Sequence, residues 1–180
     1  MSRIDVHIAQ ASSRYPDHWL LTLRRYLLFA AVGNLVWETL HLPLYTLWQD
    51  GTVGELIFAV VHCTGGDILI ALSSLVLALV LFGDGAWPEQ RYKPVAARTI
   101  VFGLGYTIFS EWLNTSVQAS WTYSETMPVI PVIGTGLSPF AQWIVIPLAG
   151  FWWARRPTRN LMKSTTAALP FVSDQSRNHV

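Results

Sequence analysis

The stretch VGELIFAVVHCTGGDILIALSSLVLALVLF, from Val53 to Phe82, is the most hydrophobic segment of this 180-residue chain. Its second half, from Ile68 onward, contains no charged residue. A helix needs about 20 mostly apolar residues to cross the hydrocarbon core of a bilayer. The segment is therefore predicted to be a membrane-spanning helix, and it sets the interpretation of the rest of the chain.

Three further segments fit the same description, over about residues 26–48, 95–115 and 139–154. The last is predicted to begin after Ser138 as N-cap, with Pro139 at the first helical position. At 1.5 Å per residue this helix is only about 22 Å long. We therefore expect residues 128–138 to dip toward the membrane as irregular chain, against other protein surface. The predicted fold is all-α: a polytopic integral membrane protein with four transmembrane helices in a bundle.

The composition excludes several other classes of protein. The chain is 52% hydrophobic and 13% charged, whereas about 25% of the residues of an ordinary soluble domain are charged. Such a chain is too apolar to be disordered. Its net charge of +1 excludes binding to nucleic acid through bulk positive charge. The single Cys63 excludes an internal disulfide framework. A soluble helical protein is disfavoured, because four apolar spans are hard to bury in 180 residues.

The positive charges predict the orientation in the membrane. All 12 Lys and Arg residues fall in the N-terminal segment, the loop between the second and third spans, or the C-terminal tail, and the loops at 49–55 and 116–130 contain none. Positive charge accumulates on the cytoplasmic side, so both termini are predicted to be cytoplasmic. We expect an interfacial or cytoplasmic segment over 1–25, a transmembrane domain over 26–154 and a mobile tail over 155–180. The short chain and the lack of a targeting segment favour a bacterial inner membrane.

Five ionisable side chains remain within the predicted spans: Glu38, His41, His62, Asp67 and Glu111. A charge at bilayer depth is costly, so such residues usually face the bundle interior and mark function. The topology places Asp67 near the middle of the membrane and the other four in its outer half. The sequence therefore predicts a Glu/His pocket near the outer face.

Helical spacing gathers the polar side chains into stripes, because residues three and four apart share a face. The first span carries one stripe, at spacings of four, three and four: Asn34, Glu38, His41 and Tyr45. The third span carries another: Thr107, Glu111 and Asn114. On the second span, His62 and Asp67 lie about 140° apart around the helix. They face different ways unless Gly65-Gly66 loosens this turn.

The first functional hypothesis is acid–base catalysis on an isoprenoid or another lipid-soluble substrate. A carboxyl buried in apolar surroundings holds its proton more tightly than in water and can donate it near neutral pH. Glu111 is the candidate acid, Glu38 and His41 a supporting pair, and His62 a relay or base. The aromatic faces of some neighbouring residues could stabilise positive charge on the substrate. The residues that could contact the substrate are Asp67, Asn114, Trp112, Trp121, Tyr123 and Gln142. Core packing and interface anchoring are the alternative roles of the aromatic residues.

Other hypotheses remain open. Glu38-x-x-His41 is a Glu-x-x-His step of the kind that supplies two ligands in di-iron bundles. Together with His62 and Glu111, Glu38 and His41 could bind iron, zinc, copper or manganese. Alternatively, Glu38 and His41 form only a hydrogen-bonded pair. The polar cluster could instead belong to a transporter. Four spans are few for a transporter, so the chain would have to form a homo-oligomer. A further alternative is an accessory subunit of a membrane complex. The sequence identifies no cofactor, and the only partners it predicts are the bilayer and a hydrophobic small molecule.

The order of residues from Glu111 onward resembles two groups of integral-membrane isoprenoid enzymes, the membrane terpene cyclases of meroterpenoid pathways and the carotenoid hydratases. In both, a membrane carboxylate precedes an aromatic stretch and a Pro-containing turn. Here these are Trp121-Thr122-Tyr123, followed by Met127-Pro128, Pro131, Gly134 and Trp143. The resemblance lies in the kinds of residue, covers about a third of the chain, and implies chemistry on an isoprenoid without naming a substrate.

Overall fold

A computed structural model describes residues 3–156, with side chains from residue 18 onward. The predictions made for residues 157–180 lie outside this part. The described chain is helical and contains no β-strand, which confirms the predicted all-α class. In chain order its elements are α1 (Arg3–His41), η1 (Leu42–Leu44), α2 (Leu47–Asp50), α3 (Val53–Phe82), α4 (Tyr92–Trp112), η2 (Leu113–Val117, π-helical) and α5 (Leu137–Ala154).

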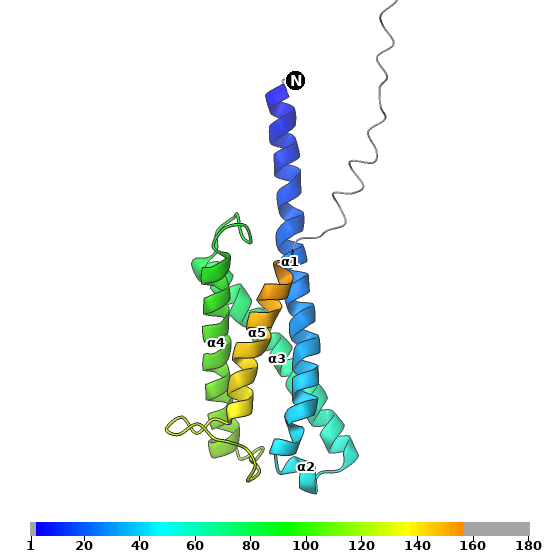
Figure 1. The fold of residues 1–180 in the computed structure, drawn as a ribbon, viewed down its shortest axis with the longest axis vertical. Coiled ribbons are helices and arrows are strands. Elements are labelled where there is room, and N and C mark those ends of the chain that lie inside the picture. Colours follow the sequence, from blue (N-terminus) through cyan, green and yellow to red (C-terminus); the bar gives the residue numbers. More distant parts are fainter. Residues whose placement is uncertain (1–2, 157–180) are drawn as a thin grey trace, which may run out of the picture.

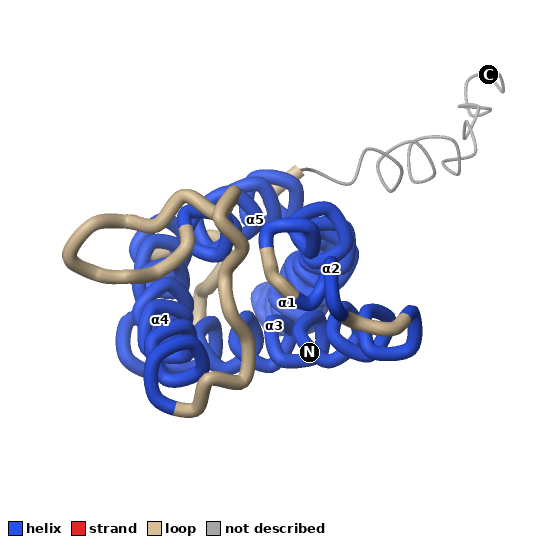
Figure 2. The backbone as a smooth tube through the Cα atoms, turned by 90° about the horizontal axis from the view of Figure 1, so that it is seen from below, coloured by secondary structure: helices blue, strands red, loops and turns tan. Residues whose placement is uncertain are grey.

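The four long helices alternate in direction. The start of α4 and the end of α5 lie at one end of the bundle, and α2 and the loop before α5 lie at the other (Figure 1). The first turns of α1 extend beyond the bundle at the former end. α1 packs against α3 and α5, and α4 packs against the same two helices. Seen along the bundle, the helices therefore surround a common interior (Figure 2).

Two of the described helical segments are long and apolar enough to cross a membrane: His18–Leu44 and Val53–Phe82. Only 28% of the most apolar window of each is buried. A core helix of a soluble protein would be mostly buried, because its apolar side chains have to leave water. α5 is 18 residues long, or about 27 Å, and contains no charged residue.

The boundaries of α1, α4 and α5 differ from the predicted ones. α1 begins at Arg3 rather than near residue 26, and α4 covers Tyr92–Trp112 rather than about 95–115. α1 ends at His41, because Pro43 lies in the next turn, and the chain continues as short helical turns rather than as one helix to residue 48. α5 begins at Leu137, two residues before the predicted start. Its N-cap is Gly136, so the prediction that Ser138 caps this helix is wrong. The bounds of α3 coincide with the predicted segment.

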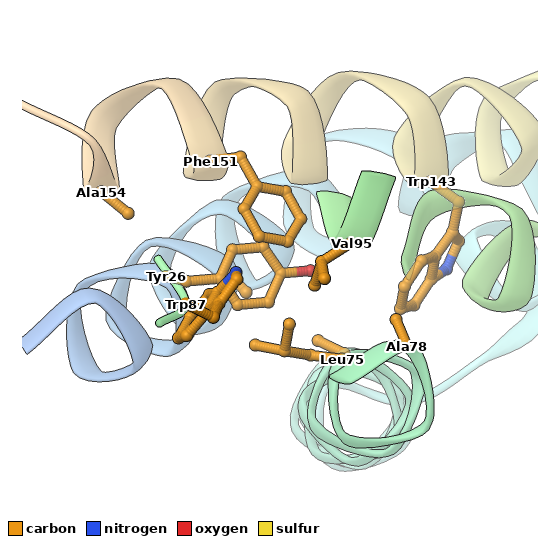
Figure 3. Packing of buried hydrophobic residues seen from close by; sticks show 10 residues of the cluster. Tyr26, Leu75, Ala78, Trp87, Val95, Trp143, Phe151 and Ala154 are labelled. Atoms are coloured by element: carbon orange, nitrogen blue, oxygen red, sulfur yellow. The ribbon is translucent and has the colours of Figure 1, made fainter. Parts of the chain in front are cut away.

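The apolar core lies between α5 and the three other long helices (Figure 3). The ring of Tyr26 stacks on that of Phe151, with centroids 4.3 Å apart. The indole of Trp143 lies over Gly103, where an added Cβ would stand only 2.3 Å from Trp143 Cε3. Small residues at helix contacts let membrane helices approach closely. Trp143 therefore fixes the packing of α5 against α4, just beside the polar residues of the interior.

Candidate functional site

Gln142 on α5 lies at the centre of a buried polar cluster. Its side-chain nitrogen is 3.0 Å from Asn34 Oδ1, 2.9 Å from Glu38 Oε1 and 2.9 Å from Asp67 Oδ2. Asn34 and Glu38 are on α1 and Asp67 is on α3, so three helices converge on one amide group. Glu38 and Asp67 are each only 8% exposed. The cluster is therefore inside the bundle and joins its helices.

The Gln142 amide has fewer N–H groups than there are acceptor oxygens around it. An amide nitrogen carries two N–H groups, whereas three acceptor oxygens lie within hydrogen-bond distance of Gln142 Nε2. The two carboxyl groups and the Asn34 oxygen therefore compete for one amide group. Gln142 thus brings the buried Glu38 and Asp67 together inside the bundle.

A chain of hydrogen bonds leads from Glu38 toward the start of α5. His41 Nε2 is 3.1 Å from Glu38 Oε2, and His41 Nδ1 is 2.9 Å from Ser138 Oγ. The same hydroxyl accepts a hydrogen bond of 3.1 Å from Trp37 Nε1. His41 lies at the last residue of α1, where the helix ends before Pro43. Each ring nitrogen of His41 thus has a hydrogen-bond partner, and the ring joins Glu38 to the start of α5.

Glu111 on α4 belongs to a second polar group. Tyr123 in the following loop donates its hydroxyl proton to Glu111 Oε2, and the Tyr123 oxygen accepts a hydrogen bond of 2.9 Å from the Gly136 N–H. Burial and the neighbouring Glu111 carboxylate raise the pKa of Tyr123 well above its usual value. The phenol therefore stays protonated and acts as a donor to Glu111 over the whole physiological pH range.

Tyr45 lies between the two groups. Its ring centroid is 5.3 Å from the His41 ring and 5.5 Å from the Tyr123 ring. Two backbone hydrogen bonds, Thr46 N–H to the Thr122 carbonyl and Ser124 N–H to the Leu44 carbonyl, hold this turn against the loop. Glu38, His41 and Glu111 are thereby gathered near one end of the bundle, joined by three aromatic or imidazole rings.

In the part of the chain whose side chains are described, no Lys or Arg pairs with Glu38, Asp67 or Glu111. His41 pairs with Glu38, and the other ion pairs, Arg91–Asp84 and His18–Glu89, lie at partly exposed positions. A buried carboxylate without a cation is costly. The neutral donors Gln142 and Tyr123 contact these carboxyl groups instead.

The structure does not bring all of the predicted site residues into these two groups. His62 is exposed and stacks on Phe58 one turn earlier, with ring centroids 5.3 Å apart. α3 is regular through Gly65-Gly66, so the predicted 140° separation keeps His62 away from the buried Asp67.

Two other predicted site residues also lie outside the two polar groups. Asn114 donates back to the Ser110 carbonyl of its own helix, and Trp112 is 50% exposed. The half-buried indole of Trp121 lies beside the Glu111 carboxyl, although its N–H forms no hydrogen bond among the described residues. Of the aromatic residues proposed to contact a substrate, Tyr123 is the one that bonds to a buried carboxyl.

Sequence reasoning missed Ser138 as a partner of His41, because it assigned that hydroxyl to the helix cap. Tyr45 was placed on the polar stripe of α1 but not in the site. The stripe is confirmed within α1, since Asn34, Glu38 and His41 are buried. Tyr45 is buried too, but it lies beyond the end of this helix. The signal that could have indicated Ser138 as a partner is its place in the sequence. It is a hydroxyl residue at the start of a predicted helix, at the same membrane level as the polar stripe of the first span.

The metal hypothesis has partial geometric support. Glu38 and His41 lie side by side, as the Glu-x-x-His spacing predicts. Between residues 18 and 156, however, no group of three or more His, Cys, Asp or Glu side chains is arranged to hold a metal ion. The predicted further ligand His62 faces away from this pair.

Comparisons with protein-family models, curated proteins and solved structures found no match to this chain.

Proposed function

We propose that all four long helices span a membrane, with the polar site near the outer face. The support is the apolar side chains exposed on every one of these helices. They are Leu28, Val32 and Leu40 on α1, Ile57, Leu69 and Val80 on α3, Val101 and Phe109 on α4, and Val145, Leu148 and Trp152 on α5. Monomeric soluble proteins rarely expose contiguous apolar surface on this scale.

The basic residues support the orientation with both termini in the cytoplasm. Arg25 donates to the Arg156 carbonyl, and Tyr92 donates to the Phe151 carbonyl. These contacts hold the basic stretches of α1, α4 and α5 at one level of the bundle, opposite to α2 and the loop before α5. Positive charge on the cytoplasmic side then puts Glu38, His41 and Glu111 toward the outer side. A bacterial inner membrane is the setting that we propose.

Within this membrane we propose an acid–base enzyme that acts on a lipid-soluble substrate of the isoprenoid or related class. The single observation that carries the proposal is the convergence of Glu38 and Asp67 on Gln142 Nε2, with more acceptors than protons. Buried carboxyl groups of this kind cost stability. Within a membrane they therefore usually mark a functional site, such as one for proton transfer. Exposed apolar surface on all sides favours a substrate that arrives from the bilayer.

The proposed reaction begins with the transfer of a proton from Glu111 to an alkene carbon of the substrate. Tyr123, already a donor to Glu111, then stabilises the carboxylate that forms. The Glu38–His41 pair accepts a proton from the resulting cation, and the Asp67–Gln142 group spreads the added charge. One proton is given and one is taken, so isomerisation or cyclisation needs no net redox change.

The test uses solvent deuterium. The purified protein in lipid nanodiscs is incubated in D2O with a lipid extract from its source organism, and the lipids are examined by mass spectrometry. The proposal predicts a lipid that gains deuterium at a carbon position in a protein-dependent manner. An extract that remains unchanged contradicts an enzyme of this type.

The two alternatives predict different results. A metal-binding protein using Glu38 and His41 would purify with a stoichiometric metal ion that is lost in His41→Gln, as measured by elemental analysis. A transporter would give proton or solute flux in proteoliposomes without any change in the lipids. The hydrogen-bonded Glu38–His41 contact is common to both alternatives and to the enzyme.

A further inference from the structure

Residues 128–137, here called the apolar loop, form a surface that the proposed chemistry does not use. Their exposed side chains are aliphatic: Val129, Val132, Ile133 and Leu137, of which Val132 is fully exposed. No charged residue occurs from Thr126 to Ala154. The charged Glu125 and the exposed polar Thr122 and Thr126 lie just before the loop. The connection between η2 and α5 is thus divided into a polar first part and an apolar second part.

Three backbone hydrogen bonds join the apolar loop to itself. Ile130 N–H donates to the Thr135 carbonyl at 2.9 Å, and Gly134 N–H donates to the Ile130 carbonyl at 3.0 Å. Leu137 N–H closes the loop on the Pro128 carbonyl at 2.7 Å. An unpaired backbone group is costly in a region without water. Internal pairing of this kind lets an irregular segment enter an apolar environment.

The conformation of the tip keeps its side chains outward. Val132 has a φ of 75° and Gly134 one of 74°. A positive φ is strained for a β-branched residue and persists only where the surroundings compensate for it. No described side chain covers Val132, and the hydrogen bond from the Gly134 N–H to the Ile130 carbonyl holds the turn around it.

The direction of the loop identifies its surroundings. In Figure 1 the segment that leads into α5 projects sideways past α4, near the start of α5. In Figure 2, seen along the bundle, it again extends beyond the helices. A loop that served only as a connection in water would not need to leave the bundle sideways. A sideways projection at this end meets the outer leaflet of a membrane into which the four helices insert.

We propose that the apolar loop inserts into the outer leaflet of the bilayer and contacts its acyl chains. The inference rests on the proposed membrane orientation, but not on acid–base chemistry. Gly136 N–H donates to Tyr123, and Tyr123 donates to Glu111. Lipid contact at the loop is therefore linked through two hydrogen bonds to Glu111.

The experiment measures the depth of single labels in nanodiscs of phosphatidylcholine and phosphatidylglycerol, which leave both faces open to water. In a Cys63→Ala background, an environment-sensitive fluorophore is attached at Val132→Cys, Glu125→Cys or Leu69→Cys. Each label is exposed to aqueous iodide and, separately, to phospholipid that carries a nitroxide near the carbonyl region. Glu125, exposed on the same connection, is the matched control for water, and Leu69, exposed on α3, is the control for the bilayer.

The proposal predicts that nitroxide lipid quenches the Val132 label several-fold more than it quenches the Glu125 label, and that iodide gives the reverse order. A Val132 label that behaves like the Glu125 label overturns the inference. Protection of Val132 from both quenchers also overturns it, because a second copy of the chain would then cover the loop. If iodide also quenches the Leu69 label, the membrane proposal fails as a whole. That result differs from failure of the loop alone, in which Leu69 stays protected.

Discussion

The Gln142 side chain donates a hydrogen bond of 2.9 Å to Asp67, although 75 residues separate the two in sequence. The same nitrogen lies within hydrogen-bond distance of Asn34 and Glu38. Gln142 therefore ties α5 to α1 and α3 at the point where the buried carboxyl groups meet. This arrangement is both a structural link between helices and the place where the proposed proton transfer is centred.

Gln142→Leu should destabilise the protein. The change keeps the volume of the side chain but leaves the oxygens of Asn34, Glu38 and Asp67 without their donor. An unpaired buried polar group costs about 1–3 kcal/mol, so the free energy of unfolding should fall by at least about that amount. Intrinsic tryptophan fluorescence during heating in detergent measures the effect. Leu148→Ala, at an exposed position of the same helix, is the control. Equal melting temperatures for Gln142→Leu and the wild type would contradict the central role of Gln142.

Gly103→Ala tests the packing of α4 against α5. A Cβ at this position would lie 2.3 Å from Trp143 Cε3 and 2.4 Å from Cζ3, so the indole has to move. Overpacking of this kind costs about 1–3 kcal/mol. Gly105→Ala, two residues further along, is a matched control because a Cβ there meets nothing within 4 Å. We expect a lower melting temperature for Gly103→Ala alone, and a similar value for both variants would refute this packing.

Tyr123 should affect stability at alkaline pH. Its pKa is raised in the folded state by burial and by Glu111, whereas in the unfolded chain it is about 10. The folded state therefore binds the proton more tightly. Its contribution to stability is complete below pH 10 and is lost as the pH rises above that value. Tyr123→Phe should lose less stability than the wild type above about pH 10, in unfolding monitored against pH. Parallel losses in the two proteins would show that Tyr123 titrates normally.

The faces of the helices were predictable from the sequence, because spacing along a helix fixes which side chains lie together. The stripe Asn34, Glu38 and His41 on α1 is buried along its whole length. Asp67 is buried while His62 is exposed, as their angular separation predicts. In these cases the information is local, since a regular helix carries its geometry from residue to residue.

The partners across helices were not predictable in the same way. Ser138 bonds to His41 over 97 residues of sequence, and this contact depends on how α5 is rotated against α1. Spacing within a helix contains no information about that rotation or about the crossing angle. The break of α1 at His41 has a local cause in Pro43, but its consequence, that Tyr45 turns toward Tyr123, depends on the packed loop.

The most direct test of the proposed acid–base function compares Glu111→Gln with Glu125→Gln in the D2O assay. Glu111 is buried and bonded to Tyr123, whereas Glu125 is exposed on the adjoining loop. The same charge is removed in both variants, and only one removes the proposed proton donor. General acid catalysis contributes about 10²–10⁴-fold to a rate. The account predicts that Glu111→Gln lowers deuterium transfer to lipid by about that factor, with unchanged folding and insertion, while Glu125→Gln retains the wild-type rate. Full deuterium transfer by Glu111→Gln would contradict the account.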